Sequence, residues 1–140
     1  MSKMGLLVVL LAVAAPAGAA DAPETERSVE GVRAVEAHWQ KAFLGGDAAY
    51  LDSLLDPAYV SVGHAGNARP KAEIVALSKK VAEKHMMPQP PAHPATIVVR
   101  DNAAVVTDSG SGDTSVDVFY YADGRWHAWY SQHTPVQPAK

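Results

Sequence analysis

The stretch that decides the fold runs from Ser115 to His133 and reads S-V-D-V-F-Y-Y-A-D-G-R-W-H-A-W-Y-S-Q-H. Two runs of aromatic and β-prone residues meet at Asp123-Gly124, a dipeptide typical of a two-residue hairpin turn. We therefore predict an antiparallel β-hairpin with its turn at these two residues.

Counting outward from this turn predicts which side chains share a face of the hairpin. One face would carry the pairs Tyr121–Trp126, Phe119–Ala128, Asp117–Tyr130 and Ser115–Gln132. The other face would carry the pairs Tyr120–His127, Val118–Trp129 and Val116–Ser131. Because Asp117, Tyr130 and Gln132 place polar groups on a largely apolar face, we expect that face to line a cavity.

The N-terminal residues have the composition of a secretory signal peptide. Lys3 supplies a positive charge, Met4 to Ala15 form an apolar run, and Ala17-Gly18-Ala19 resembles a cleavage site. The apolar run is shorter than the roughly 20 residues that span a bilayer. We predict a signal peptide over residues 1–20, cleaved after Ala19 or Ala20. The mature protein would be exported, most simply to the periplasm, without a membrane anchor.

The amino-acid composition argues against several classes of binding partner. The chain of 140 residues has no Cys, 48% hydrophobic residues and a formal net charge of −3. An exported domain without disulfides has to be stabilised by a packed core. A mildly acidic chain without a basic stripe argues against nucleic acid and anionic membranes as partners. The six histidines show no H-x-H or H-E-x-x-H spacing, so we expect neither a metal nor another cofactor.

Patterning along the rest of the chain predicts three helices ahead of a mostly antiparallel sheet. The helical period and its stop signals favour helices over residues 27–45, 47–55 and 70–85. Alternation favours strands over 58–63, 96–101 and 103–108, before the hairpin. Residues 64–69, 86–94 and 109–114 read as a loop, a proline-rich connector and a flexible link. The expected organisation is a loose tether at 21–26, one α+β domain at 27–136 and a tail at 137–140.

Four local motifs occur in this order: W-Q-K-A-F-L-G-G-D at 39–47, Leu54 to Val62, Pro70-Lys71-Ala72-Glu73, and D-V-F-Y-Y-A-D-G-R-W at 117–126. Their order and spacing resemble the nuclear transport factor 2-like superfamily, which includes SnoaL-like polyketide cyclases and ketosteroid isomerases. Within that superfamily the chain is most similar to small exported proteins of unknown function. The resemblance implies a cone: a curved antiparallel sheet wrapped around a long N-terminal helix, with a pocket at the open end.

The resemblance also implies roles for the two faces of the sheet. In related kinase-association domains, the strand positions that match Asp117, Tyr130 and Gln132 point into the pocket. The predicted ligand-binding pocket consists of Trp39, Tyr59, Asp117, Phe119, Tyr130 and Gln132. Members of the superfamily commonly dimerise through the outer face. The predicted homodimer face consists of Val118, Tyr120, His127 and Trp129.

The chain departs from the ketosteroid isomerases at their reacting groups. Trp39 stands where that family has a tyrosine, and no carboxylate occurs near Val62 or Gly63, where its base would fall. We therefore do not expect isomerisation by the family mechanism. Asp117 and His64 are the remaining candidates for proton transfer. The alternative for Asp117 is a structural hydrogen bond with Tyr130 across the strands.

Three functions stay open on the sequence. The leading hypothesis is an exported domain that binds a small, largely apolar molecule in the pocket, without a required reaction. The first alternative is an isomerase, cyclase or hydrolase that uses Asp117 and His64. The second alternative is a protein-interaction or assembly module that acts through the outer face of the sheet.

Overall fold

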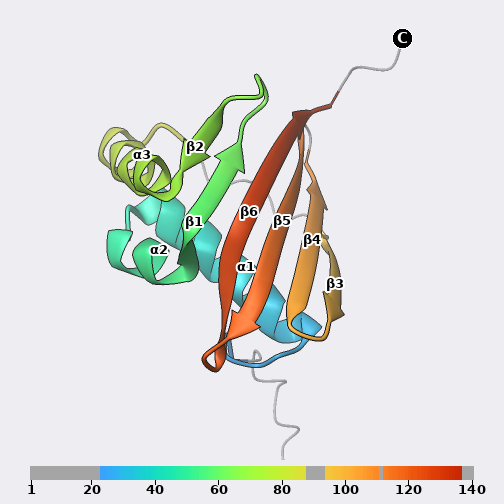
Figure 1. Ribbon diagram of the computed structural model, residues 1–140. Helices are drawn as coiled ribbons and strands as arrows, with labels where there is room; N and C mark the ends of the chain where they lie inside the picture. The colour runs from blue at the N-terminus through green and yellow to red at the C-terminus, as the bar shows by residue number, and fades with distance from the viewer. Residues whose placement is uncertain (1–22, 88–93, 111, 137–140) are drawn as a thin grey trace, which may run out of the picture.

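The computed structural model describes residues 23–87, 94–110 and 112–136 (Figure 1). These residues form helices α1 (Val29–Gly45), α2 (Ala48–Leu54) and α3 (Lys71–Lys84). The strands are β1 (Leu55–Val62), β2 (Ala68–Pro70), β3 (Thr96–Arg100), β4 (Ala103–Ser109), β5 (Asp113–Ala122) and β6 (Arg125–Pro135). The sheet order is β2-β1-β6-β5-β4-β3; β1 and β6 are parallel and the other neighbours are antiparallel. The predicted α+β class is confirmed.

The open, curved sheet encloses α1 on one face. Figure 1 shows α1 crossing behind the sheet, with α2 and α3 beside the edge formed by β1 and β2. The core lies between α1 and the inner side chains of the sheet, where Val32, Phe119 and Ala128 have no exposed surface. This arrangement is the predicted cone. None of the helices in the described ranges is long and apolar enough to cross a membrane.

Capping residues set the ends of the helices. The Ser28 side chain accepts a hydrogen bond from the Gly31 amide at 3.1 Å and begins α1. Gly46, with φ of 71°, ends α1 in the left-handed conformation that glycine adopts without strain. The Asp47 carboxylate accepts from the Tyr50 amide at 3.0 Å and begins α2. The end of the first helix at residue 45 and the start of the second at residue 47, both predicted from the sequence, agree with these caps.

The β5–β6 hairpin has the predicted turn but only part of the predicted register. Asp123 and Gly124 have φ of 52° and 75°, and Tyr121–Trp126, Tyr120–His127 and Phe119–Ala128 pair as expected. A β-bulge follows, in which Trp129 has no partner on β5. Beyond it the pairs are Val118–Tyr130, Asp117–Ser131, Val116–Gln132 and Ser115–His133. The predicted register beyond Phe119 is therefore wrong by one residue.

Two connections differ from the sequence-based expectation, and a third is only partly described. The predicted loop 64–69 contains the start of β2, which pairs with the end of β1. The predicted flexible link 109–114 is a short turn, because β4 extends to Ser109 and the Gly110 amide bonds to the Asp113 carbonyl at 2.8 Å. The proline-rich connector is described only at its ends, since residues 88–93 lie outside the described ranges.

The end of the predicted tether is bound to the domain. The Trp126 indole donates to the Glu26 carbonyl at 2.9 Å, and the Tyr121 hydroxyl donates to the Thr25 carbonyl at 2.7 Å. Glu24 accepts from the Tyr50 hydroxyl at 2.9 Å and lies 2.5 Å from His38 Nδ1. The expectation of a loose tether is therefore wrong for residues 23–26. The predicted signal peptide and tail lie outside the described residues.

Candidate functional site

The inner face of the sheet, α1 and α3 together enclose a cavity of about 640 Å³. Most of its exposed wall is apolar, and the large apolar side chains that line it include Trp39, Phe43, Leu44, Tyr59, Ile74 and Leu77. A separate surface groove of about 720 Å³ lies along α3, over Lys71, Lys79 and Lys80. The inner cavity is the stronger candidate, because apolar walls with a few converging polar groups are typical of small-molecule sites.

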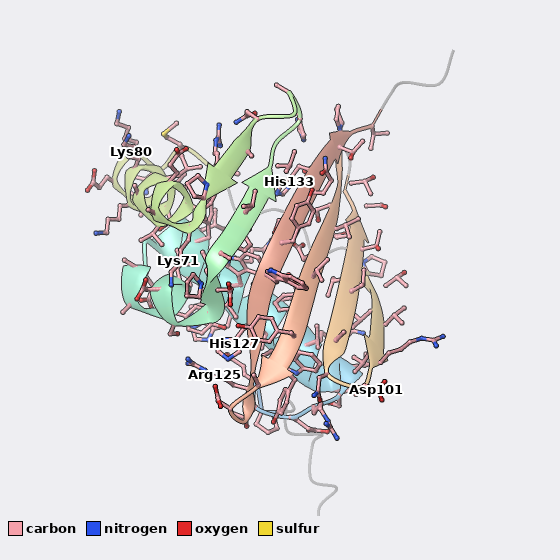
Figure 2. The ribbon with its side chains drawn as sticks, viewed as in Figure 1. Lys71, Lys80, Asp101, Arg125, His127 and His133 are labelled. Carbon is pink, nitrogen blue, oxygen red and sulfur yellow. The ribbon has the colours of Figure 1, made fainter. Side chains whose placement is uncertain are left out.

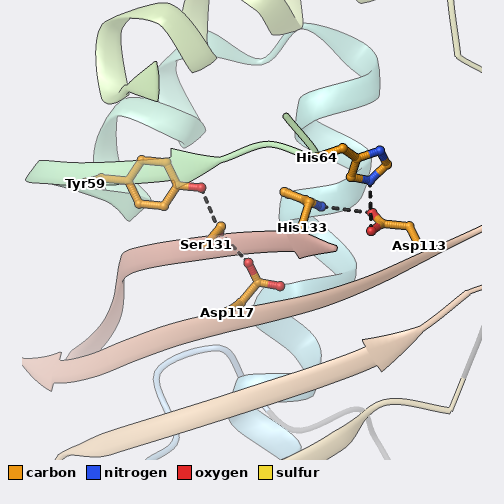
Figure 3. A network of polar contacts seen from close by, with 6 residues as sticks. All are labelled: Tyr59, His64, Asp113, Asp117, Ser131 and His133. Carbon is orange, nitrogen blue, oxygen red and sulfur yellow. Dashed lines mark hydrogen bonds and ion pairs between the residues drawn. The ribbon is translucent and has the colours of Figure 1, made fainter. Parts of the chain in front are cut away.

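A chain of hydrogen bonds joins three elements at one side of this cavity (Figure 3). The Tyr59 hydroxyl, from β1, donates to Ser131 Oγ on β6 at 2.7 Å. Ser131 in turn donates its own proton to Asp117 Oδ1 on β5. Tyr59 and Ser131 are each only 2% exposed. Asp117 and Ser131 are direct cross-strand partners, which makes this contact possible. Both side chains line the cavity.

Burial governs the charge of the carboxyl groups here. Burial raises the pKa of Asp117, although the hydrogen bond from Ser131 and the nearby His133 both lower it. Burial also raises the pKa of Glu36, on α1, well above its usual range, and the charges of Asp117 and Asp108 raise it further. The charge of Asp108 also contributes to the raised pKa of Asp117. This end of the cavity therefore holds protons more tightly than exposed carboxylates would.

A second cluster of polar side chains, Asp113 with His64 and His133, lies at the rim of the cavity. Asp113 Oδ2 is 3.0 Å from His133 Nδ1, and Asp113 Oδ1 is 3.0 Å from His64 Nε2 (Figure 3). The two imidazole rings are 6.4 Å apart, between their centroids. Burial alone would raise the pKa of Asp113, but hydrogen bonds from His133 and His64 outweigh it and lower the pKa. Asp113 thus links the β1–β2 loop to β6.

The structure brings together four of the predicted site residues. Trp39, Tyr59, His64 and Asp117 all line the cavity. Phe119 does not line it, because it is completely buried beneath Trp39, with the ring centroids 5.8 Å apart.

Tyr130 and Gln132 lie on the opposite face of the sheet, so their assignment to the pocket is wrong. The bulge at Trp129 adds one residue to β6 and reverses the facing of each residue after it. Tyr130 pairs with Val118, and its hydroxyl donates to Gln132 Oε1 at 2.8 Å. The alternative role for Asp117, a hydrogen bond from Tyr130, is wrong for the same reason. Ser131 supplies that bond instead.

The polar residues of the site that sequence reasoning missed include Glu36, Arg69, Asp113, Ser131 and His133. Glu36 carried a readable signal, since it is an acidic residue four positions after Val32 and three before Trp39, on the apolar face of α1. Ser131 and His133 could be assigned only once the bulge was known. His127 and His133, both on β6, lie toward opposite ends of the strand (Figure 2). Within the described ranges, no group of three or more potential metal-ligating side chains is arranged to hold an ion.

Solved structures show where this fold occurs elsewhere. A protein from Streptomyces avermitilis, provisionally named a dehydratase of the nuclear transport factor 2-like family, superposes with a TM-score of 0.66. It is 19% identical, and the match covers 79% of this chain and 96% of that one. An uncharacterised protein with a cystatin-like fold from Caulobacter vibrioides has a TM-score of 0.63 and 12% identity, over 76% of this chain and 88% of that one.

A domain from Exiguobacterium sibiricum, provisionally named a Ca/calmodulin-dependent kinase II association domain, has a TM-score of 0.61 and 16% identity. The match covers 81% of this chain and 98% of that chain. No protein-family model matches the sequence, and no curated protein does either. The chain has the nuclear transport factor 2-like fold, an α+β fold shared with these solved structures.

Proposed function

We propose that the protein binds a small, largely apolar molecule in the cavity between α1, α3 and the inner face of the sheet. The observation that carries this proposal is the cavity itself. Large apolar side chains form much of its wall, and the polar groups that also line it include Glu36 and Asp117. A cavity of about 640 Å³ falls within the range that encloses small organic ligands. Such a ligand would be held mainly by apolar burial and oriented by the polar groups.

Native mass spectrometry of the protein, purified without a tag from the organism that makes it, tests the proposal. We expect the wild type to carry a small-molecule adduct. Leu77→Trp, which fills the cavity from α3, should abolish the adduct. Tyr130→Phe serves as the control, because Tyr130 lies on the opposite face and should leave the adduct in place. An adduct that persists in Leu77→Trp would contradict this location.

An acid–base enzyme of isomerase, cyclase or hydrolase type is the second candidate function. Two observations favour it: the raised pKa of Asp117, and the pair of histidines that Asp113 holds at the rim. In this reading Asp117 is the base and His64 the second proton-transfer group. A bell-shaped pH dependence of the rate and near-complete loss of activity in Asp117→Asn are expected. Full activity in that variant would exclude Asp117 as the base.

Export to the periplasm is part of the proposal and rests on the sequence of residues 1–20 alone. Mass spectrometry of the protein from a periplasmic fraction should give the mass of a chain that begins at Ala20 or Asp21. A full-length chain confined to the cytoplasm would contradict export.

The outer face of the sheet supports a third proposal, a homodimer or another protein contact. A row of apolar residues, Val98, Val105, Val118 and Tyr130, crosses four strands through successive cross-strand pairs. Trp129 is 55% exposed beside this row, and the rings of Tyr120 and His127 stack at 5.0 Å nearby. An apolar patch of this kind is typical of a contact between proteins. Tyr130, which was expected in the pocket, extends this face instead.

A further inference from the structure

Three carboxyl groups from three different elements lie at the cavity or interact with its lining. Glu36 comes from α1, Asp108 from β4 and Asp117 from β5. Asp108 and Asp117 lie close enough to Glu36 that their negative charges raise its pKa. Glu36 and Asp117 also line the cavity directly. A ligand inside the cavity would therefore meet a concentration of negative charge, or of protons, at this point.

The protein leaves these carboxyls incompletely paired. No Lys or Arg in the described ranges forms an ion pair with any of the three. The nearby His133 lowers the pKa of Asp117, but its Nδ1 lies 3.0 Å from Asp113 Oδ2. Glu36 Oε1 and Asp108 Oδ1 are buried and accept no hydrogen bond from the described residues. Buried carboxyl oxygens without a donor are costly, so an external donor would stabilise them.

The wall next to these carboxyls suits a cation with an apolar body. The Trp39 and Tyr59 rings meet edge to face, with centroids 5.9 Å apart, and both line the cavity. Aromatic faces attract organic cations by cation–π interaction, and they also contact apolar chains. The cationisable groups of the cavity, Arg69, His64 and His133, are contributed by β2, the β1–β2 loop and the far end of β6. The two carboxyls that line the cavity, Glu36 and Asp117, are therefore separate from the basic groups, and Asp113 already pairs with both histidines.

We infer that the bound molecule carries a protonated amine, which inserts toward Glu36 and Asp117 while its apolar part contacts the Trp39 side of the cavity. This inference rests on the proposed function, because it names the chemical class of ligand for the same cavity. An ammonium group supplies a hydrogen-bond donor for the unpaired carboxyl of Glu36 and a positive charge beside Glu36 and Asp117. A molecule of the same shape without that group would bind through apolar contact alone.

The test compares three probes that differ only at one end: 4-phenylbutylamine, 4-phenylbutanol and 4-phenylbutyrate. Their affinities for the full mature protein at neutral pH are measured by titration calorimetry. We expect the amine to bind at least about tenfold more tightly than the alcohol, and the carboxylate to bind weakest. Glu36→Gln should reduce the advantage of the amine to within about threefold and leave the alcohol unchanged. Asp117→Asn provides a second variant with the same expectation.

Glu73→Gln is the matched control, since it removes one negative charge from an exposed position on α3 outside the cavity. It should leave all three affinities unchanged. Equal affinities of amine and alcohol for the wild type would overturn the amine inference and keep the proposed binding function. Tightest binding of 4-phenylbutyrate would also overturn the amine inference. It would indicate that an anionic ligand group binds Arg69 and the rim histidines instead. If none of the probes bound, both the inference and the proposed cavity function would be contradicted.

Discussion

Glu36 lines the cavity, but its burial lowers the stability of the folded protein at neutral pH. It lies on the face of α1 that contacts the sheet, where Val32 and Val35 are buried. Burial, together with the charges of Asp117 and Asp108, raises its pKa well above that of an ordinary glutamate. The folded protein consequently binds this proton more tightly than the unfolded chain does. By linkage, the contribution of Glu36 to stability decreases as pH rises from the unfolded pKa toward the folded one.

The pH dependence of unfolding checks this sign. Glu36→Gln should stabilise the protein at neutral pH by about 1–2 kcal/mol, because the amide needs no charge to be buried. The gain should shrink as pH falls toward about 4, where glutamate is protonated in both states. Urea unfolding at several pH values measures the difference. Glu73→Gln, at an exposed position, should show no such trend. An unchanged stability of Glu36→Gln across this range would refute the assignment.

At the scale of elements, a single extra residue in β6 decides what faces the cavity. The regular alternation of the sequence would place Tyr130 and Gln132 inside. The bulge at Trp129 places Ser131 and His133 there instead. The inner positions before the bulge, Trp126 and Ala128, are fixed by the core, where they are 2% and 0% exposed. The bulge thus leaves the core half of the hairpin intact and changes only the half that lines the cavity.

The contact between α1 and α3 offers an element-scale prediction. A Cβ on Gly46 would lie 2.9 Å from the Ala82 Cβ on α3, and Gly46 also has a positive φ. Gly46→Ala should therefore cost about 2–3 kcal/mol, from backbone strain and from the displaced helix. Gly66→Ala has a similar φ of 79° with open space around it, so it should cost only about 1 kcal/mol. If Gly46→Ala and Gly66→Ala lost equal stability in thermal or urea unfolding, the close contact with Ala82 would not contribute to the cost of Gly46→Ala.

At the scale of the whole molecule, the inner face of the sheet is the proposed ligand site and the outer face is the proposed dimer contact. The inner face, with α1 and α3, encloses the cavity. The outer face carries the apolar row and Trp129 without any covering element among the described residues. Residues 23–26 also close one end of the domain, through the bonds of Glu26 and Thr25 to β6 and β5. A second copy of the chain on the outer face would shield the patch from water.

The mass in solution tests the outer face. We expect the mature wild type to be a dimer and Trp129→Lys to be a monomer, because a buried lysine would disrupt an apolar interface. Sedimentation equilibrium provides the measurement. Met86→Lys is the control, because Met86 is exposed to a similar degree, at 59%, and lies beyond α3 instead of on the sheet. A monomeric wild type would contradict the dimer proposal.

Local signals in the sequence were sufficient for most of the fold. The turn at Asp123-Gly124, the helix stop at Gly46 and the cap at Asp47 each depend on residues within a few positions of one another. The apolar period of α1 likewise identified the helix that the sheet encloses. These features are set by backbone conformation and local hydrogen bonding, which neighbouring residues control directly.

Tertiary structure alone decided the composition of the candidate site. Asp113 pairs with His64 and His133, and β1 runs parallel to β6. The charges of Asp108 and Asp117 act on Glu36, although these residues are far apart in the chain. The bulge at Trp129 has no local signature such as a glycine, so alternation alone predicted the wrong face for Tyr130. Sequence patterns record which side chains prefer burial, whereas register and long-range pairing depend on how the whole sheet closes over α1.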